Sequence, residues 1–386
     1  MVAVRSGEEC QLEVRSSLLD IDAREWDGLI GNDDQPFLRH AFLSALEESG
    51  SVRRELGWSP MPLVLRHAGV AIAAAPGYLK TNSHGEFVFD WAWADAYQRN
   101  GLAYYPKLLL AVPYSPIPGA RLLVGDGPDA ARRRQLIGQS LLALAQQTRL
   151  SSIHINFVSE ADAAACACDP WLPRYDWQYH WNNPGYRDFD DFLGTLTSKK
   201  RKNILQERRQ AHAHGFEITW QDAVDLGQSD LDQIHALYQS TFERKHNTAA
   251  LSRACFSLLR ERFGRQFHVC SARLGTRVIA AAVFFSSTTT LYGRYWGALD
   301  DFAGLHFELC YYQGIEYAIA SGKRRIEPGA QGEHKIARGF LPTRTRSVHY
   351  IAHPQFRKAI RHALDEEAQG LRDYRAELDT KSPYRV

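Results

Sequence analysis

Hydrophobic and polar positions follow the same order in two stretches of this chain that lie about two hundred residues apart. In the second half, the apolar runs 279–286 and 290–296 have the length and the β-branched and aromatic content of strands. Apolar residues then recur every three or four positions over 305–320, which predicts a helix with one buried face. Gly322 is a suitable C-cap for this helix, and the basic residues that follow it favour the negative end of the helix dipole.

The first half repeats this order with GVAIAAA at 69–75 and EFVFDWAW at 86–93. Trp296 and Gly304 follow their counterparts Trp93 and Gly101 by the same 203 positions. We therefore predict strands at 69–75, 86–93 and 121–124 and a helix at 102–111. A repeat of this length indicates tandem domains of one fold, because solenoid repeats are far shorter. A hairpin followed by a helix and a further strand is an α/β (α+β) arrangement with helices on a mixed sheet.

The boundary between the halves is predicted at a concentrated turn signal, NNPG at 182–185. The preceding stretch, 171–181, alternates aromatic and polar residues and predicts a strand. We therefore expect domains at 1–185 and 186–386. A chain of 386 residues is long enough for each domain to bury its own core.

Composition indicates an ordinary globular protein, with 45% hydrophobic and 23% charged residues. No run of eighteen uncharged apolar residues occurs, and the N-terminus carries acidic residues where a signal peptide needs an apolar core. We therefore expect a soluble, cytoplasmic protein without a transmembrane segment. Cys166 and Cys168 form a C-x-C without a second pair or a nearby histidine, so we expect reduced structural thiols and no zinc site. The oligomeric state is not indicated.

Four consecutive cations open the next predicted helix, which we expect to run from an N-cap at Ser198 to a terminating glycine at Gly215. They lie at the positive end of the helix dipole, where each cation is unfavourable by roughly 0.3 to 1 kcal/mol. A bound anion reverses that effect, because free N–H groups and side-chain cations converge on it. The alternative is a solvated basic face, the usual form of a charge run. Since the net charge is only +2, we expect local binding of a phosphate-bearing ligand by Lys199, Lys200, Arg201 and Lys202.

A glycine-rich segment, EPGAQGEHKIARGF at 327–340, follows a predicted strand. Three glycines interleaved with ionisable residues exclude a core element and predict a loop whose backbone approaches a ligand closely. The segment is neither a Walker A loop nor a dinucleotide fingerprint, because both spacings are missing. The alternative is a plain turn region. We expect substrate binding, together with the basic helix, by Gly329, Gln331, Gly332, Lys335 and Arg338.

A general base is expected near the start of the helix at 305–320 or in the glycine-rich segment. His306 and Glu308 are two positions apart, so they lie on different helix faces and do not form a ligand pair. The candidates for the base are His306, Glu308, Glu333 and His334. Tyr295 and Trp296 are expected to line the cleft, where an apolar wall shifts the pKa of a nearby acid or base. The alternative for His306 is a helix-start residue bound to the backbone.

Three segments together resemble a known family: SKKRKNI at 198–204, GLHFELCYYQGIEYAI at 304–319 and, most specifically, EPGAQGEHKIARGFLP at 327–342. The chain is similar through them to the FemAB-like predicted N-acyltransferases, also described as peptidoglycan biosynthesis or recognition proteins. The similarity extends from Trp26 to His362. The resemblance implies two GNAT-like domains, each with a mixed, splayed sheet flanked by helices, and transfer of an acyl or aminoacyl group to an amine. Better-known Fem transferases use aminoacyl-tRNA and extend a peptidoglycan precursor.

One departure from the GNAT pattern bears on the donor. Ordinary GNAT enzymes hold the pyrophosphate of acyl-CoA with a glycine-rich loop at the start of the helix after the splayed strands. Here that place reads DDFAGLH, with Asp300 and Asp301 and a single glycine, and two carboxylates repel a pyrophosphate. The departure favours aminoacyl-tRNA held near the basic helix, with acyl-CoA as the other possible donor. No tightly bound cofactor and no metal are expected.

The expected mechanism is direct attack of a neutral amine on an activated ester or thioester, with the tetrahedral charge stabilised by backbone N–H groups at a strand edge. No G-x-S-x-G occurs and no cysteine has a neighbouring base, which disfavours covalent catalysis. We expect the active site in the second domain, because the first lacks counterparts of His306 and Glu308. The acceptor is an amine-bearing small molecule or a cell-wall precursor.

Two other classes of function remain open. The first is a non-catalytic binding protein of the same fold that recognises a cell-wall precursor or tRNA. The second is a metal hydrolase that uses His334, His349 and His353, whose spacing fixes no carboxylate partner.

Overall fold

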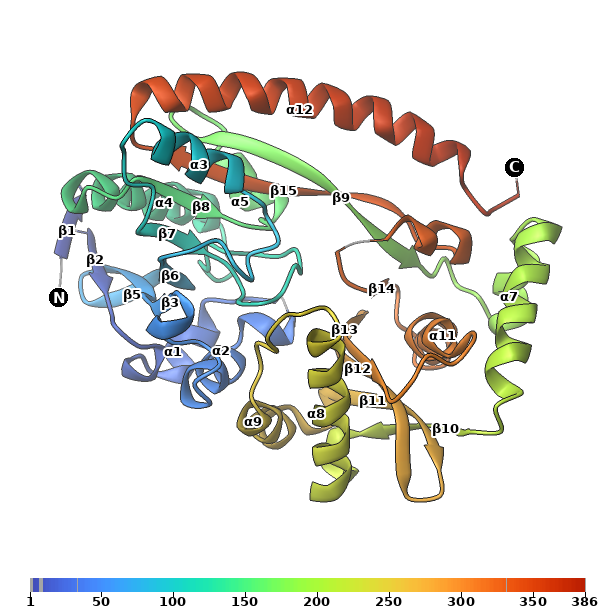
Figure 1. Cartoon of the computed structure of the whole chain (residues 1–386). Coiled ribbons are helices and arrows are strands. Elements are labelled where there is room, and N and C mark those ends of the chain that lie inside the picture. The colour runs from blue at the N-terminus through green and yellow to red at the C-terminus, as the bar shows by residue number, and fades with distance from the viewer. Residues whose placement is uncertain (1–2, 7–9, 33, 331, 386) are drawn as a thin grey trace. The chain divides into compact units, whose positions relative to one another are not determined.

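The computed structural model describes residues 3–6, 10–32, 34–330 and 332–385 (Figure 1). The chain forms two compact units: unit 1 comprises Met1–Asp176 and Arg344–Tyr374, and unit 2 comprises Trp177–Thr343 and Arg375–Val386. The predicted limit at residue 185 thus lies inside unit 2, and residues 344–374, assigned by the prediction to the second domain, belong to unit 1. The chain changes unit within three long elements, β9 (Leu172–Asn182), β15 (Leu341–Ile351) and α12 (Pro354–Thr380).

Unit 1 contains two sets of paired strands and the helices that pack on them. One set, β1-β2-β4-β5, is antiparallel throughout. In the other, β15-β8-β7-β6-β3, only β7 and β8 are parallel, and α4 connects them. The further elements are β1 (Ala3–Ser6), β2 (Cys10–Val14), α1 (Ala23–Gly28), α2 (His40–Glu48), β3 (Trp58–Pro60), β4 (Leu63–His67), β5 (Val70–Ala75), β6 (Gly77–Lys80), α3 (Trp91–Arg99), β7 (Lys107–Leu110), α4 (Ala130–Thr148), β8 (Ser152–Ile155) and α5 (Glu160–Ala165).

Unit 2 contains the strands β10-β11-β12-β13-β14-β9, of which β13 and β14 are parallel and the others antiparallel. The connection from β13 to β14 is α10, a π-helical turn at Glu308–Tyr312, and α11. The elements are α6 (Phe189–Gly194), α7 (Ser198–His212), β10 (Glu217–Asp222), α8 (Gln228–Glu243), α9 (Arg253–Phe263), β11 (Phe267–Leu274), β12 (Arg277–Ser286), β13 (Thr290–Ala298), α10 (Leu305–Phe307), α11 (Gln313–Ala320), β14 (Arg325–Glu327) and a 3₁₀ helix at Glu333–Arg338.

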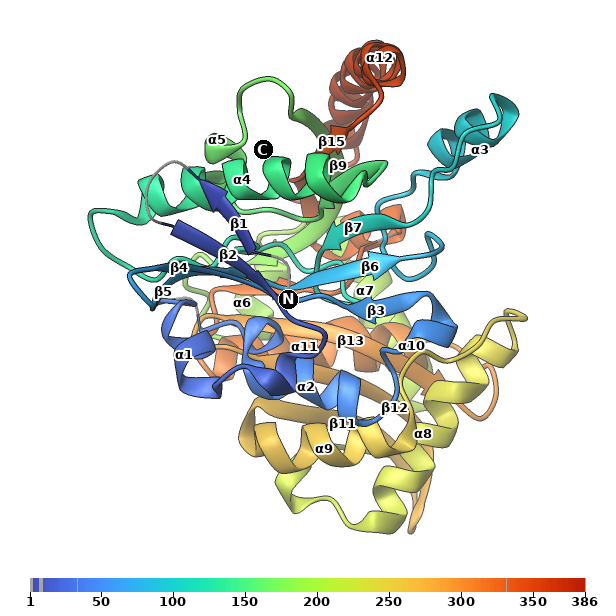
Figure 2. The same cartoon turned by 90° about the vertical axis from the view of Figure 1, so that its left-hand side faces the viewer.

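Both faces of β12 are buried, which explains its uninterrupted apolar sequence. Neighbouring residues on a strand point to opposite faces. Phe284 packs on Trp220 of β10, which stacks on Tyr317 of α11, whereas Phe285 packs on Phe263 of α9. Figure 2 shows α8 and α9 together beside β11 and β12.

The predicted fold class, α/β with mixed sheets flanked by helices, is confirmed. In the second half, the predicted strands 279–286 and 290–296 are β12 and β13, and the predicted helix 305–320 is the α10–α11 connection. The predicted aromatic strand before the turn is β9. Each unit therefore has a parallel strand pair joined by a helix, β7–α4–β8 in unit 1 and β13–α11–β14 in unit 2.

The elements predicted in the first half are partly wrong. Only β5 matches: 86–90 is not a strand, α3 begins at Trp91, and 102–111 contains the strand β7 in place of a helix. The segment 121–124 contributes only an isolated bridge, from Leu123 to Ala74. A short run such as KLLL, buried at every position, has no periodicity that separates strand from helix. The constant offset of 203 is thus not a structural equivalence, because Trp93 lies on α3 and Trp296 on β13.

Candidate functional site

The parallel strands β13 and β14 separate after three paired residues. Thr290 to Tyr292 pair with Arg325 to Glu327, and beyond Tyr292 β13 continues against β12 alone. The residue after β14 is Pro328, which has no N–H to continue the ladder. The absence of a side chain at Gly293 lets the diverging chain pass close by, because a Cβ atom at this position would lie 3.3 Å from Pro328 Cα. The sheet of unit 2 is therefore splayed at its middle strands.

A β-bulge lies at the same point of β13. Val283 of β12 pairs with Tyr295 and the next residue, Phe284, pairs with Gly293, so Arg294 is the additional residue. A bulge interrupts the regular ladder and redirects backbone and side-chain groups, and bulges often lie next to active sites. Nothing in the sequence around Arg294 signals this irregularity.

A cavity of about 100 Å³ opens where the strands separate. His306, Tyr295 and Trp296, three of the predicted site residues, all line it, together with Gly293, Arg294, Cys310, Tyr311 and Pro328. His306 packs edge-on against Trp296 at 5.2 Å between ring centroids. Burial lowers the pKa of His306 to about 4, and the neighbouring side chains of His334, Arg338 and Lys335 act in the same direction. His306 is thus a neutral imidazole at physiological pH, with one ring nitrogen that carries no proton.

Glu308 does not line the cavity. Its carboxylate is fully buried and accepts hydrogen bonds from Arg208, at 2.9 Å to Oε1 and 3.1 Å to Oε2. Gln313 Nε2 donates to Oε1 of the same carboxylate at 2.9 Å. Both oxygens therefore already accept from donors within the protein, away from the cavity that His306 lines. Arg208 was not singled out by the sequence, because its partner lies one hundred positions away.

The glycine-rich segment folds around two buried cations. Lys335 Nζ donates to the carbonyl oxygens of Gly329, at 2.8 Å, and Pro328, at 3.3 Å. Burial lowers the pKa of Lys335 to about 8. Arg338 pairs with Glu207 of α7 at 2.7 Å and lies 3.4 Å from the ring centroid of Phe307. Both side chains therefore hold the segment in place from inside.

The other predicted residues of this segment that the structure describes near its turn, Gly332, Glu333 and His334, are less buried than Lys335 and Arg338. His334 Nε2 is 3.0 Å from the hydroxyl of Tyr311, which lines the cavity, and burial and nearby cations lower the pKa of His334. Glu333 forms a surface ion pair with Lys381 at 2.9 Å. Gly332 has a φ of +114°, and a Cβ atom there would lie 2.4 Å from the His334 ring, so glycine is required. Gln331 lies outside the described residues.

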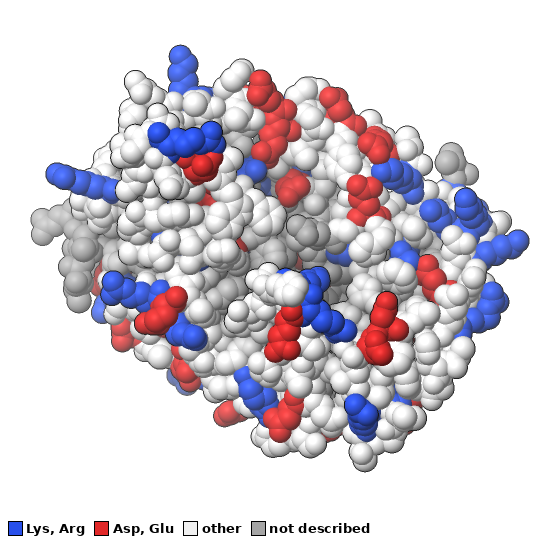
Figure 3. All heavy atoms as spheres, viewed as in Figure 1, with Lys and Arg blue, Asp and Glu red and all other residues white. Residues whose placement is uncertain are grey.

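The predicted basic helix is α7, which begins at Ser198 with Thr197 as its N-cap. Thr197 makes no side-chain cap hydrogen bond. In the described part of the chain, the side chains of Lys199, Lys200, Arg201 and Lys202 form neither an ion pair nor a hydrogen bond. In the space-filling view, Lys and Arg side chains gather along the edge of the molecule where Figure 1 places α7 (Figure 3). The basic first turn is thus available to a ligand.

The start of α10 is covered by α7. Gly304 has a φ of +79°, and a Cβ atom there would lie 2.4 Å from the carbonyl oxygen of Glu207. His214 Nε2 also lies 3.2 Å from the carbonyl oxygen of Ala303. The N-terminus at which ordinary GNAT enzymes hold a pyrophosphate is therefore packed against protein, next to the exposed carboxylates of Asp300 and Asp301.

The described ranges contain neither a metal-binding cluster nor a membrane-spanning helix. Within them, no group of three or more His, Cys, Asp or Glu side chains is arranged to hold a metal ion, so His334, His349 and His353 do not form one. None of the helices there has the length and apolar character needed to span a bilayer. The six cysteines, all described, form no disulfide.

Comparisons with known proteins agree with this architecture. FemX has a TM-score of 0.53 at 10% identity, over 90% of this chain and 100% of that chain. A conserved protein of unknown function from Bacteroides thetaiotaomicron has a TM-score of 0.52 at 12% identity, over 88% and 99%. L-PGS from Bacillus licheniformis has a TM-score of 0.50 at 9% identity, over 87% and 98%. At such low identity these similarities establish the fold.

Among curated protein sequences, none matches the chain significantly. A protein-family model does match, over residues 17–386, and its family is FemAB-like, described as peptidoglycan biosynthesis/recognition. Because that match extends over nearly the whole length, this chain belongs to the FemAB-like family.

Proposed function

We propose that the chain is an N-acyltransferase that moves an acyl or aminoacyl group from an activated donor to an amine, at the splayed strands of unit 2. The observation that carries the proposal is the cavity at the bulge of β13, lined by His306, Tyr295 and Trp296. A diverging strand pair presents backbone groups to a bound carbonyl, and an apolar lining excludes water from an activated ester.

The proposed reaction is direct attack of the neutral amine on the donor carbonyl. Donors on the interrupted β13 ladder stabilise the tetrahedral oxyanion, and His306 accepts the proton that the nitrogen loses as the new bond forms. As the intermediate collapses, His306 passes this proton to the leaving hydroxyl or thiol, which restores the neutral imidazole. His306 is favoured over His334 and Glu333 because it lines the cavity, whereas Glu333 pairs with Lys381 at the surface.

The proposed donor is aminoacyl-tRNA. Two observations support it over acyl-CoA: α7 covers the start of α10, and the first turn of α7 carries four cations without ion pairs among the described residues. Free N–H groups and cations at a helix start attract phosphate. We propose that Lys199 to Lys202 bind backbone phosphates of the donor in a cytoplasmic reaction. The family description supports a peptidoglycan precursor as the amine acceptor.

A transfer assay tests this proposal. The purified full-length chain is incubated with an amine-bearing peptidoglycan precursor and either radiolabelled aminoacyl-tRNA or radiolabelled acetyl-CoA, and label in the precursor is counted. We expect label from aminoacyl-tRNA, and a kcat about 100-fold lower for His306→Gln, since general bases contribute roughly 10²–10⁴-fold. His362→Gln is the matched control, because the His362 side chain is 79% exposed.

Three other results would change the assignment. Label from acetyl-CoA alone would transfer the donor assignment to acyl-CoA. Binding of tRNA or precursor without any transfer would favour the non-catalytic binding protein. Undiminished transfer by His306→Gln would remove His306 from the mechanism and leave His334 and Glu333 to be tested.

A further inference from the structure

One face of the unit 1 sheet is lined by buried polar side chains. β8 and β15 both contain the pattern Ser-x-His, as Ser152 and His154 on one strand and Ser347 and His349 on the other. The two strands are antiparallel, and His154 lies directly opposite His349. The intervening residues point to the other face, where they join the apolar core with α4: Ile153, Ile155, Val348 and Tyr350.

A chain of hydrogen bonds runs through this polar face. Ser347 Oγ lies 2.9 Å from His349 Nε2, and His349 Nδ1 lies 2.7 Å from His154 Nδ1. On the far side, His154 Nε2 lies 3.1 Å from the hydroxyl of Tyr104, which donates to Asp90 Oδ2 at 2.6 Å. All five residues are buried.

Asp90, at the end of these hydrogen bonds, acts only as a hydrogen-bond acceptor. Burial by itself would raise the pKa of Asp90, but Lys107, which donates to its Oδ2, and the neighbouring His154 hold that pKa well below its usual value. Burial and Lys107 lower the pKa of His154 to about 3, and burial and the His154 ring lower that of His349. Both imidazoles are therefore neutral, and each carries one N–H.

These constraints set the direction of every hydrogen bond. The hydroxyl of Tyr104 gives its hydrogen to Asp90, so its oxygen can only accept, and His154 Nε2, 3.1 Å from that oxygen, therefore carries the proton. Ser152 Oγ, 2.8 Å from the same nitrogen, is a second acceptor for it. His154 Nδ1 must then accept from His349 Nδ1–H, which leaves His349 Nε2 to accept the hydroxyl hydrogen of Ser347. The oxygen of Ser347 thus has only lone pairs left for any other partner.

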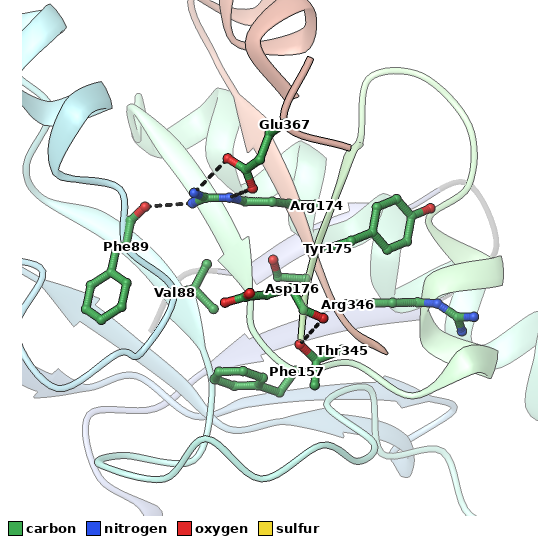
Figure 4. Close-up of a pocket in the computed structure, with 10 residues that line it drawn as sticks. Val88, Phe89, Phe157, Arg174, Tyr175, Asp176, Thr345, Arg346 and Glu367 are labelled. Carbon is green, nitrogen blue, oxygen red and sulfur yellow. Dashed lines mark hydrogen bonds and ion pairs between the residues drawn. The ribbon is translucent and has the colours of Figure 1, made fainter. Parts of the chain in front are cut away.

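Ser347 lines a cavity of about 50 Å³ that lies within unit 1 (Figure 4). Figure 4 shows Arg174 extending across the cavity to Glu367, with which it makes hydrogen bonds of 2.8 and 3.0 Å. Arg174 Nη1 also donates to the carbonyl oxygen of Phe89 at 2.6 Å. This guanidinium donates to partners within the protein and is therefore not positioned to bind an anion.

Oxygen atoms also line this cavity. The hydroxyl of Thr345 donates to the backbone carbonyl of Asp176 at 3.2 Å, so its oxygen, like that of Ser347, offers lone pairs. The carboxylate residue Asp176 and the rings of Phe89 and Phe157 belong to the same lining. Two hydroxyl oxygens, a carboxylate and aromatic rings together suit a cation that donates hydrogen bonds.

We propose that this cavity of unit 1 is a binding site for a primary ammonium group, in which the hydrogen-bond chain from Asp90 holds Ser347 as an obligate acceptor. The volume accommodates an ammonium head group, since one water molecule occupies about 30 Å³ in the liquid. The ammonium keeps its proton, because an alkylammonium of pKa about 10 cannot protonate a carboxylate as acidic as Asp90. The site is independent of the transfer chemistry proposed for unit 2.

Ligand-observed NMR titration and calorimetry on the full-length chain test the site with three probes. Propylammonium carries charge and N–H donors, tetramethylammonium carries charge without N–H, and 1-propanol has the shape without charge. We expect binding of propylammonium alone. Ser347→Ala should weaken it at least about tenfold, as expected for a hydrogen bond to a charged group. Ser152→Ala is the matched control, because Ser152 makes the equivalent contact to His154, at 2.8 Å, and does not line the cavity; its binding should change less than about twofold.

Other outcomes would overturn the proposal. Equal binding of 1-propanol or tetramethylammonium, equal losses in the two serine variants, or displacement of propylammonium by potassium or magnesium ions would each contradict it. A binding enthalpy that depends on the ionisation enthalpy of the buffer would show that a proton is released on binding. This would contradict an ammonium group that keeps its charge in the site. If Ser347→Ala fails to fold by circular dichroism, Asp176→Asn provides the second variant and must weaken propylammonium binding. His306→Gln should leave this binding unchanged, which separates failure here from failure of the transferase proposal.

Discussion

Arg338 holds Glu207 through two hydrogen bonds, from Nη2 to Oε1 at 2.7 Å and from Nε to Oε2 at 3.1 Å. This pair connects the glycine-rich segment to α7, the two features predicted to bind a ligand together. Arg338 is buried and also contacts Tyr312 and the Phe307 ring. Its position therefore indicates that it holds the glycine-rich segment in place, whereas the cations of the first turn of α7 remain free to bind a ligand.

Replacing Arg338 by Ala should destabilise the protein by roughly 3 kcal/mol, because it leaves a partly buried carboxylate without its partner. Urea denaturation followed by circular dichroism measures this loss. Arg187→Ala is the control: Arg187 pairs with Asp191 at the surface with 81% of its side chain exposed, and its loss should leave stability nearly unchanged. Similar effects of the two substitutions would contradict the role of Arg338 as a buried link.

Replacing Lys199 and Lys202 by Ala should leave thermal stability unchanged or slightly higher, since both side chains are exposed at the unfavourable end of the helix dipole. The same double variant should bind tRNA more weakly. Its slope of log K against log salt should decrease by about 2, because about one counterion is released per phosphate contact. Filter binding at several salt concentrations measures this slope. Retained affinity and slope, with a lower melting temperature, would make the basic turn a structural feature.

Gly304→Ala should destabilise more than Gly322→Ala. Both glycines have positive φ, +79° and +69°, so both substitutions carry a similar backbone cost of about 1 kcal/mol. Only at Gly304 would the new Cβ atom meet protein, 2.4 Å from Glu207 O, while nothing lies within 4 Å at Gly322. We expect an additional loss of roughly 1–3 kcal/mol at Gly304 from overpacking against α7, measured by thermal denaturation. Equal losses would show that α7 does not pack against the start of α10.

Stability should fall as the pH is lowered from 6.5 to 4, in part because of His306. Its folded pKa of about 4 lies below the usual value of 6.5, so in this window the unfolded chain binds a proton that the folded chain does not. The free energy of unfolding is therefore not reduced by His306 above pH 6.5. Below that pH it falls as the pH is lowered, by at most about 1.4 kcal/mol per pH unit. His306→Gln should reduce the slope of unfolding free energy against pH in this range, and His362→Gln should not. An unchanged slope in His306→Gln would indicate that His306 titrates normally.

Several features of this chain follow from local sequence alone. The strands β12 and β13, the helical connection after them and α7 were predicted closely, because long periodic or continuously apolar stretches bounded by turn residues specify their own secondary structure. For the same local reason the sequence predicts that the glycine-rich segment bends away from a regular strand or α-helix: Gly329, Gly332 and Gly339 all adopt positive φ. The 3₁₀ helix at Glu333–Arg338 within it was not predicted. His306, Tyr295 and Trp296 were placed in one cleft because the strand and the helix that carry them are consecutive.

Contacts between residues far apart in the chain were decided only by the tertiary structure. The run KLLL became a strand because β6 and β8 supply its hydrogen bonds. Glu308 lies outside the cavity because it pairs with Arg208, one hundred positions away. The bulge at Arg294 depends on the pairing of β13 with β12. His154 and His349, 195 positions apart, meet only because β8 and β15 pair in one register. Each of these features depends on which distant groups become neighbours, and a local pattern of polar and apolar residues does not encode that choice.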